Sequence, residues 1–142
     1  MIAVYNDKIN IDNTIKNLNK INVIKGNEKS FYFSDNLVTG EGEFPYNIKH
    51  LHSVLQRAEK TNFILTENAI VNIQNVKEVV MEYFQYAGIS IYKCCKKDAE
   101  LYVVSLLCTN GKTESISYHS FKQAQACFNE INKNLKDVEL TV

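Results

Sequence analysis

The alternation of apolar and polar residues along this chain predicts a protein built mainly from short antiparallel strands. Runs with a period of two are typical of half-buried strands, and turn dipeptides such as Asn6-Asp7, Gly26-Asn27 and Asn110-Gly111 separate them. Strands are expected at residues 2–5, 9–11, 21–25, 30–33, 63–65, 69–73, 76–84, 89–95, 101–109 and 113–118. Residues 101–107 are apolar at almost every position, which predicts a central strand covered on both faces.

Two segments carry the helical spacing of apolar residues instead. The first helix is expected over residues 47–60, with Asn47 as its N-cap and Asn62 at its end. The second begins at Ser120, which forms a capping-box pattern with Gln123. Residues 12–19 stay open between helix and turn, residues 37–44 are expected to be loop or edge strand, and residues 138–142 alternate like a terminal edge strand.

A faint internal echo suggests how these elements are grouped. Residues 2–13 recur as residues 64–75 at a constant offset of 62. The identical pairs are Ile2/Ile64, Asn6/Asn68, Asn10/Asn72, Ile11/Ile73 and Asn13/Asn75. Because an amphipathic helix follows each copy, the echo predicts an α+β fold of two related modules, residues 1–62 and 63–142. Each module would be antiparallel hairpins or a meander closed by one helix, and the two would share one compact domain.

Charge and composition narrow the classes of function. Sixteen basic residues balance sixteen acidic ones, so the net charge is zero, which disfavours nucleic acid as a partner and makes self-association easier. No apolar run approaches the roughly 20 residues that span a bilayer, and the N-terminal residues lack a signal-peptide pattern, so we expect a cytoplasmic protein. The four cysteines are then expected to be thiols. Abundant Asn, Lys and Ile indicate an AT-rich genome, such as that of a low-GC bacterium, a phage or a parasite.

The sequence offers little catalytic or cofactor chemistry. Nucleotide-binding glycine motifs and the Gly-x-Ser-x-Gly motif are absent, and we expect neither a cofactor nor a metal. His50 and His52 are two residues apart on a predicted helix and point to different sides, so they cannot share a ligand. Cys94 and Cys95 stay open between packing and a redox role. Glu41 and Glu43 flank a glycine and are expected to be solvated.

Surplus aromatic residues give the best indication of function. Tyr83, Phe84 and Tyr86 cluster before Ala87-Gly88. Tyr83 and Phe84 are adjacent at the end of a predicted strand, so one of these two faces away from the core. With Phe31 and Phe33 of the first module, they are the candidate interface, because exposed aromatics are enriched at binding hot spots. The preferred hypothesis is a non-enzymatic interaction or accessory protein. It would act as a homo-oligomer or as a phage-type inhibitor of a host protein, and residues 63–135 are similar in outline to small accessory proteins of low-GC bacteria and their phages.

Two alternatives belong to other classes. A small-ligand binder, for example of nucleotides, would hold an anion with Arg57, the only arginine, and with Lys93, Lys96 or Lys97. A weak nucleic-acid-binding module would use the same lysines with Lys112. Lysines at a hairpin tip also keep a sheet edge soluble, and we favour this role for them over nucleic-acid binding.

Overall fold

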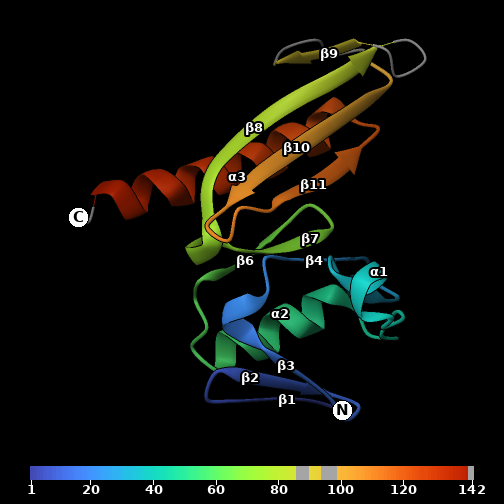
Figure 1. Ribbon diagram of the computed structural model, residues 1–142, viewed down its shortest axis with the longest axis vertical. Helices are drawn as coiled ribbons and strands as arrows, with labels where there is room; N and C mark the ends of the chain where they lie inside the picture. The colour runs from blue at the N-terminus through green and yellow to red at the C-terminus, as the bar shows by residue number, and fades with distance from the viewer. Residues whose placement is uncertain (86–89, 94–98, 141–142) are drawn as a thin grey trace. The chain divides into compact units, whose positions relative to one another are not determined.

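The computed structural model describes residues 1–85, 90–93 and 99–140 (Figure 1). The chain is an α+β protein with antiparallel sheets and a C-terminal helix. It divides into two compact units, Met1–Asn75 (unit 1) and Val76–Val142 (unit 2). The boundary expected after residue 62 lies inside unit 1. None of the helices in the described ranges is long and apolar enough to cross a membrane.

Unit 1 contains two sheets. A three-stranded sheet has the order β1-β2-β3, and a four-stranded sheet has the order β5-β4-β7-β6. The strands are β1 (Ile2–Tyr5), β2 (Lys8–Ile11), β3 (Thr14–Asn17), β4 (Val23–Gly26), β5 (Phe31–Phe33), β6 (Phe63–Thr66) and β7 (Ala69–Asn72). The helices are α1 (Asn36–Thr39) and α2 (Ile48–Arg57), with short 3₁₀ helices η1 (Leu18–Lys20) and η2 (Ile73–Asn75).

The open segment 12–19 is a turn and a strand, and the reason is local. Asp12 and Asn13 both have positive φ, 49° and 74°, and connect β2 to β3 as a two-residue hairpin turn. Positive φ at both central residues matches the twist of the strands, and Asn and Asp tolerate it better than other residues with a Cβ. The apolar spacing in this segment therefore reflects β3 and η1, in which Leu18 is buried.

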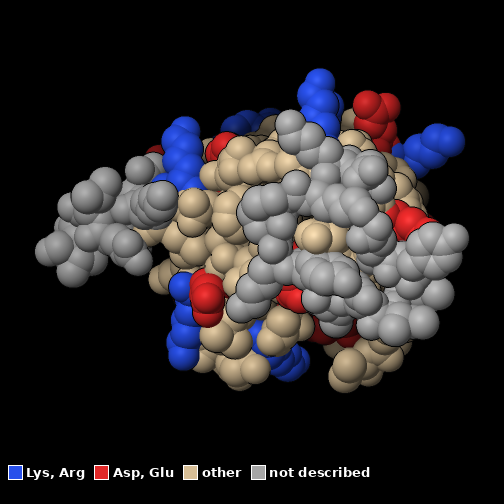
Figure 2. Space-filling model, turned by 90° about the horizontal axis from the view of Figure 1, so that it is seen from above, with Lys and Arg blue, Asp and Glu red and all other residues tan. Residues whose placement is uncertain are grey.

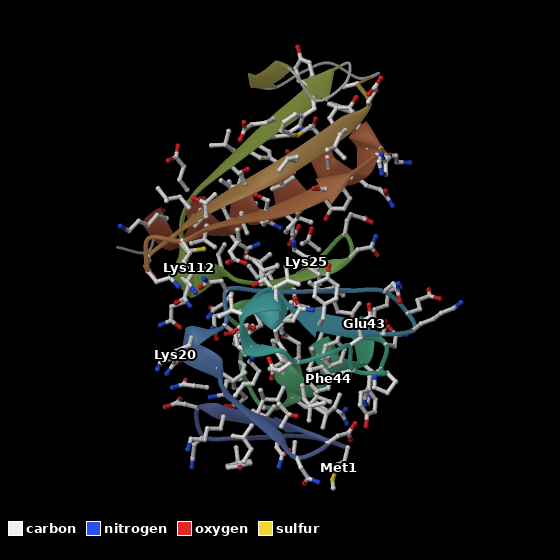
Figure 3. The ribbon with its side chains drawn as sticks, turned by 45° about the vertical axis from the view of Figure 1, so that its right-hand side comes forward. Met1, Lys20, Lys25, Glu43, Phe44 and Lys112 are labelled. Carbon is white, nitrogen blue, oxygen red and sulfur yellow. The ribbon has the colours of Figure 1, made fainter. Side chains whose placement is uncertain are left out.

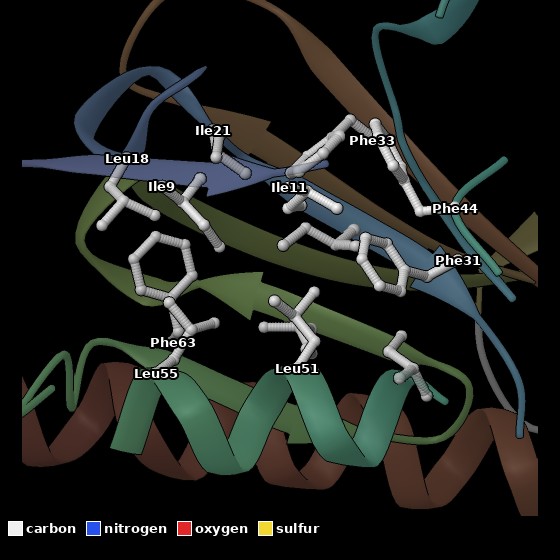
Figure 4. Close-up of a cluster of buried hydrophobic side chains, with 13 residues drawn as sticks. Ile9, Ile11, Leu18, Ile21, Phe31, Phe33, Phe44, Leu51, Leu55 and Phe63 are labelled. Carbon is white, nitrogen blue, oxygen red and sulfur yellow. The ribbon is translucent and has the colours of Figure 1, made fainter. Parts of the chain in front are cut away.

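The core of unit 1 lies between α2 and the strands. The helix begins after Asn47, whose side chain accepts a hydrogen bond from the Lys49 amide, as predicted, but it ends at Arg57. Its stripe of Ile48, Leu51 and Leu55 is buried, and it contacts β1, β6 and β7. Figure 4 shows Leu51 and Leu55 directed into the cluster that includes Ile9, Ile11 and the phenylalanines. In this cluster the Phe31 and Phe44 rings stack with centroids 5.5 Å apart.

The echo does not align equivalent positions of the structure. Both copies lie in unit 1, and both form two-residue hairpins, with turns at residues 6–7 and 67–68. Asn6 is the first residue of its turn and Asn68 the second, and each is the positive-φ residue, at 53° and 54°. An offset of 62 therefore pairs residues that differ by one position along the hairpins. The relation between two modules is not confirmed.

Unit 2 is a single antiparallel sheet with a helix across one face (Figure 1). Its strands are β8 (Val76–Gln85), β9 (Ser90–Lys93), β10 (Leu101–Cys108) and β11 (Thr113–Tyr118), in the order β11-β10-β8-β9. The helix is α3 (Phe121–Leu140), and the Ser120 hydroxyl accepts a hydrogen bond from the Gln123 amide at 3.4 Å. Because α3 continues to Leu140, the strand expected at residues 138–142 is wrong.

A close approach of two strands makes Gly26 sensitive to substitution. A Cβ on Gly26 would lie 2.5 Å from the Ser30 carbonyl oxygen and 2.6 Å from Cβ of Phe31. We therefore expect Gly26→Ala to lower the free energy of unfolding by about 1–3 kcal/mol, because the backbone of the β4–β5 hairpin must shift. Urea unfolding followed by circular dichroism measures this change. Gly42→Ala is the matched control, since no atom lies within 4 Å of its Cβ position, and equal effects would contradict the steric explanation.

A buried asparagine joins three segments of unit 1. Asn72 is 1% exposed; its Nδ2 donates to the Ile21 carbonyl at 2.9 Å and its Oδ1 accepts from Asn62 Nδ2 at 2.8 Å. The Gln74 amide is a second donor to that oxygen, at 3.2 Å. The Ile21 carbonyl also accepts from Asn75 Nδ2 at 3.3 Å, so the groups that lose their partner without the Asn72 side chain are the Asn62 side-chain amide and the Gln74 backbone amide.

Removing this side chain takes the partner from the Asn62 and Gln74 amides and leaves a cavity at a position that is 1% exposed. We expect Asn72→Ala to lower the free energy of unfolding by about 2–3 kcal/mol in the same urea experiment. Asn19→Ala, at an exposed position of η1, should change it by less than about 0.5 kcal/mol. A loss at Asn72 as small as that at Asn19 would show that the network contributes nothing to stability.

Candidate functional site

The first candidate surface is the face of the unit 2 sheet opposite α3, here called the open face. The Tyr102 and Phe121 rings meet edge to face with centroids 5.6 Å apart, which fixes the side of β10 that faces α3. Because strand residues alternate, Val104 and Leu106 share that side and are buried. The intervening residues of β10 and their partners in the register therefore make up the open face.

The open face carries apolar residues along β8 and β10, interspersed with glutamates and a serine, and hydroxyl residues on β11. The register places its members together: Glu78, Val80, Glu82 and Phe84 on β8, Leu101, Val103, Ser105 and Leu107 on β10, and Thr113, Ser115 and Ser117 on β11. Val103 is buried among these neighbours, whereas Leu107 is 40% exposed. The sequence correctly indicated that β10 is central, but the exposure of Leu107 shows that the cover expected on this side is incomplete.

The aromatic candidates fall in different places. Tyr83 pairs with Tyr102 on the α3 side, and Phe84 pairs with Leu101 on the open face, so strand alternation separates the two as predicted. Phe31 and Phe33 are fully buried in unit 1, where they pack against Phe44, so they contribute to the core and not to a surface. Tyr86 lies outside the described residues. Of the five interface candidates, Phe84 alone is placed here on a sheet face without a covering helix.

The anion-site candidates are not brought together by the part of the chain that the structure describes. Arg57 is exposed at the end of α2, where its Nε donates to the Ser53 carbonyl at 3.4 Å. The Lys93 backbone ends β9, opposite Glu82 of β8. Lys96 and Lys97 lie outside the described residues, as do Cys94 and Cys95. In the view of Figure 2, basic and acidic side chains are interspersed, without a large patch of one sign.

A second candidate surface, not found from the sequence, surrounds α1. Lys16 Nζ forms ion pairs with Asp35 at 3.2 Å and with Glu41 at 2.5 Å, and it lies 4.6 Å from the centroid of the Phe33 ring. Glu41 is therefore paired and largely covered, contrary to the expectation that it is solvated. Between these two carboxylates, Leu37 and Val38 are exposed. The signal in the sequence was an apolar pair inside the polar, glycine-containing segment 35–43.

Metal-ligating and thiol groups give no further site. Within residues 1–85, 90–93 and 99–140, no three His, Cys, Asp or Glu side chains are grouped so that they could hold a metal ion. His119 Nδ1 donates to the Glu100 carbonyl at 3.2 Å. Cys108 and Cys127 are buried, and burial raises the pKa of the Cys108 thiol to about 11.

The comparisons with known proteins do not add to this geometry. The chain matches no protein-family model, and searches of curated proteins and of solved structures returned no match either. The function is therefore argued from the surfaces themselves.

One histidine of α2 should make the stability of the protein depend on pH. Partial burial lowers the pKa of His52, against a smaller opposing effect of a hydrogen bond to the Phe63 backbone. Gln56 Nε2 lies 3.2 Å from His52 Nε2 and also donates to the Phe63 carbonyl, so the neutral imidazole is the acceptor. A lowered pKa in the folded state means that the unfolded chain binds the proton more readily.

We therefore expect the free energy of unfolding to decrease as the pH falls below about 6.5, the ordinary value for histidine. Urea unfolding at a series of pH values measures the slope. His52→Gln should flatten the slope in this range, whereas His50→Gln, at an exposed position of the same helix, should leave it unchanged. The same flattening in both variants would remove His52 as the cause.

Proposed function

We propose that this protein is a non-enzymatic interaction protein that self-associates through the open face of unit 2. The observation that carries the proposal is the set of apolar residues on that face, Val80, Phe84, Leu101, Val103 and Leu107, which follow β8 and β10 from the Phe84/Leu101 pair at one end to the 40% exposed Leu107 at the other. In the described part of unit 2, α3 is the one helix, and it covers the other side of the sheet (Figure 1). An antiparallel sheet with apolar residues on both faces needs a second layer to keep water from them.

The distribution of polar groups favours a second copy as that layer. Glutamates lie on β8, on one side of β10, and the hydroxyl residues of β11 lie on the other side of β10. A two-fold axis parallel to β10 would place β8 of each copy over β11 of the other. Glu78 and Glu82 would then meet hydroxyl groups, which can donate hydrogen bonds to them, instead of meeting each other.

The centre of such an interface would pair like with like. A strand on the axis packs against its own copy, so Val103 and Leu107 of β10 would contact the same residues of the partner. Phe84, which pairs with Leu101 at the other end of the face from Leu107, would supply the largest apolar side chain of the described open face. The zero net charge of the chain adds no long-range repulsion between copies.

The test changes the exposed leucine of the face, which lies near the end of β10. We expect Leu107→Lys to shift sedimentation equilibrium of the purified protein from dimer toward monomer, raising the dissociation constant at least tenfold, because it places a charge in an apolar contact. Phe84→Ala should act in the same direction through lost packing. Leu37→Lys, the same substitution at an exposed leucine of unit 1, is the matched control and should leave the equilibrium unchanged.

Two results would contradict the proposal. The first is a wild-type protein that stays monomeric at all concentrations tested. The second is an unchanged association in Leu107→Lys and Phe84→Ala while the circular dichroism spectrum shows an intact fold.

A further inference from the structure

A second surface, in unit 1 and separate from the open face, carries an inference that goes beyond self-association. Leu37 and Val38 are 94% and 87% exposed, the highest values among the large hydrophobic residues of the described ranges. They are adjacent on α1, between Asp35 and Gly40, so two aliphatic side chains stand together in solvent. Adjacent exposed aliphatic residues on a well-ordered turn have an unfavourable contact with water that a partner would remove.

The turn that carries this pair is closed by its own backbone. The amides of Val38 and Thr39 both donate to the Asp35 carbonyl, at 2.9 and 3.1 Å, and the Gly40 amide donates to the Asn36 carbonyl at 2.9 Å. Gly40 ends the turn with a φ of 76°, a conformation that glycine adopts without strain. The two side chains are therefore presented by a defined single turn of helix.

The base of the turn is attached to the core of unit 1. Lys16 of β3 bridges Asp35 on one side of the turn and Glu41 on the other, and its side chain is only 11% exposed. Its ammonium lies against the Phe33 ring, which itself packs on Phe44 at the end of the same segment. Figure 3 marks Glu43 and Phe44, where the chain returns to the core. A tip held in this way loses little conformational freedom when it binds.

The charges around the pair define the partner. Asp35 and Glu41 share the one ammonium of Lys16, which leaves one carboxylate charge in excess within this cluster, and the exposed Glu43, which accepts from the Ser30 hydroxyl at 3.1 Å, adds a second in the same segment. This sign opposes an anionic membrane surface or a nucleic-acid backbone, and it attracts basic side chains. We propose that Leu37 and Val38 anchor this protein in an apolar pocket of another protein, and that lysine or arginine side chains rim that pocket.

The experiment places a photo-crosslinking residue, p-benzoylphenylalanine, at position 37 of the full chain in the cells that naturally encode it. The protein that crosslinks is identified by mass spectrometry, purified, and titrated against the unmodified chain by calorimetry. We expect the double variant Leu37→Ser/Val38→Ser to bind this purified protein at least tenfold more weakly, with an unchanged urea midpoint. Glu43→Gln should reduce the salt dependence of the association rate, because it removes one attractive charge.

Several results would overturn the proposal. They are a crosslink to a second copy of the chain, to nucleic acid or to lipid alone, no crosslinked protein at all, or a purified partner that binds the double variant as tightly as the wild type. The sedimentation behaviour of the double variant separates this proposal from the preceding one, because the open face is unchanged in it. A dimer that persists while partner binding is lost supports both.

Discussion

The burial of the α2 stripe is the contact on which unit 1 depends. Leu51 and Leu55 are fully buried, and the helix reaches β1 of one sheet as well as β6 and β7 of the other. The two sheets share no strand, so the apolar contact with α2 is what gives them a common core. The aromatic group of Phe31, Phe33 and Phe44 extends this core toward β5, and the Lys16 ammonium lies over one of its rings. The attachment of α1 through Lys16 therefore depends on the same cluster of buried residues that α2 packs against.

Unit 2 builds its core from one sheet and one helix. The side of β10 that carries Tyr102, Val104 and Leu106 is buried on the α3 side, and the helix supplies Ala124, Cys127 and Ile131 to the same layer. The open face of the sheet also carries apolar residues. A chain that needed only α3 for stability would not require Val80, Phe84 and Leu107 there, and this excess of apolar surface is what gives the self-association proposal its physical basis.

Much of the fold could be predicted from the sequence, because its strongest signals are local. The hairpin at Asn110-Gly111, the helix after Asn47 and the helix after Ser120 each depend on cap or turn residues within a few positions. Residues 138–140 show the limit, since the sequence alternation there predicts a strand whereas the structure continues α3 to Leu140. The division into units was harder still. Whether β6 and β7 pair with β4 or with β8 depends on contacts between distant segments, which apolar periodicity does not encode.

The candidate sites were likewise predictable only where the signal is local. Alternation alone separated Tyr83 from Phe84, but it could not show that Phe31 and Phe33 are both in a core, because that depends on the cluster they form with Phe44 and the buried residues of α2. The α1 tip was missed because its meaning depends on Lys16, which is far from it in the sequence and close to it in space.

The positive-φ turns of unit 1 have a consequence for how this sequence can change. Asn6, Asn13 and Asn68 hold left-handed turn positions that glycine often fills in other proteins, in a chain with only five glycines. Glycine could therefore replace each of these asparagines without strain in the turn, whereas a β-branched residue could not, so these three surface positions accept far fewer residue types than their exposure alone would allow.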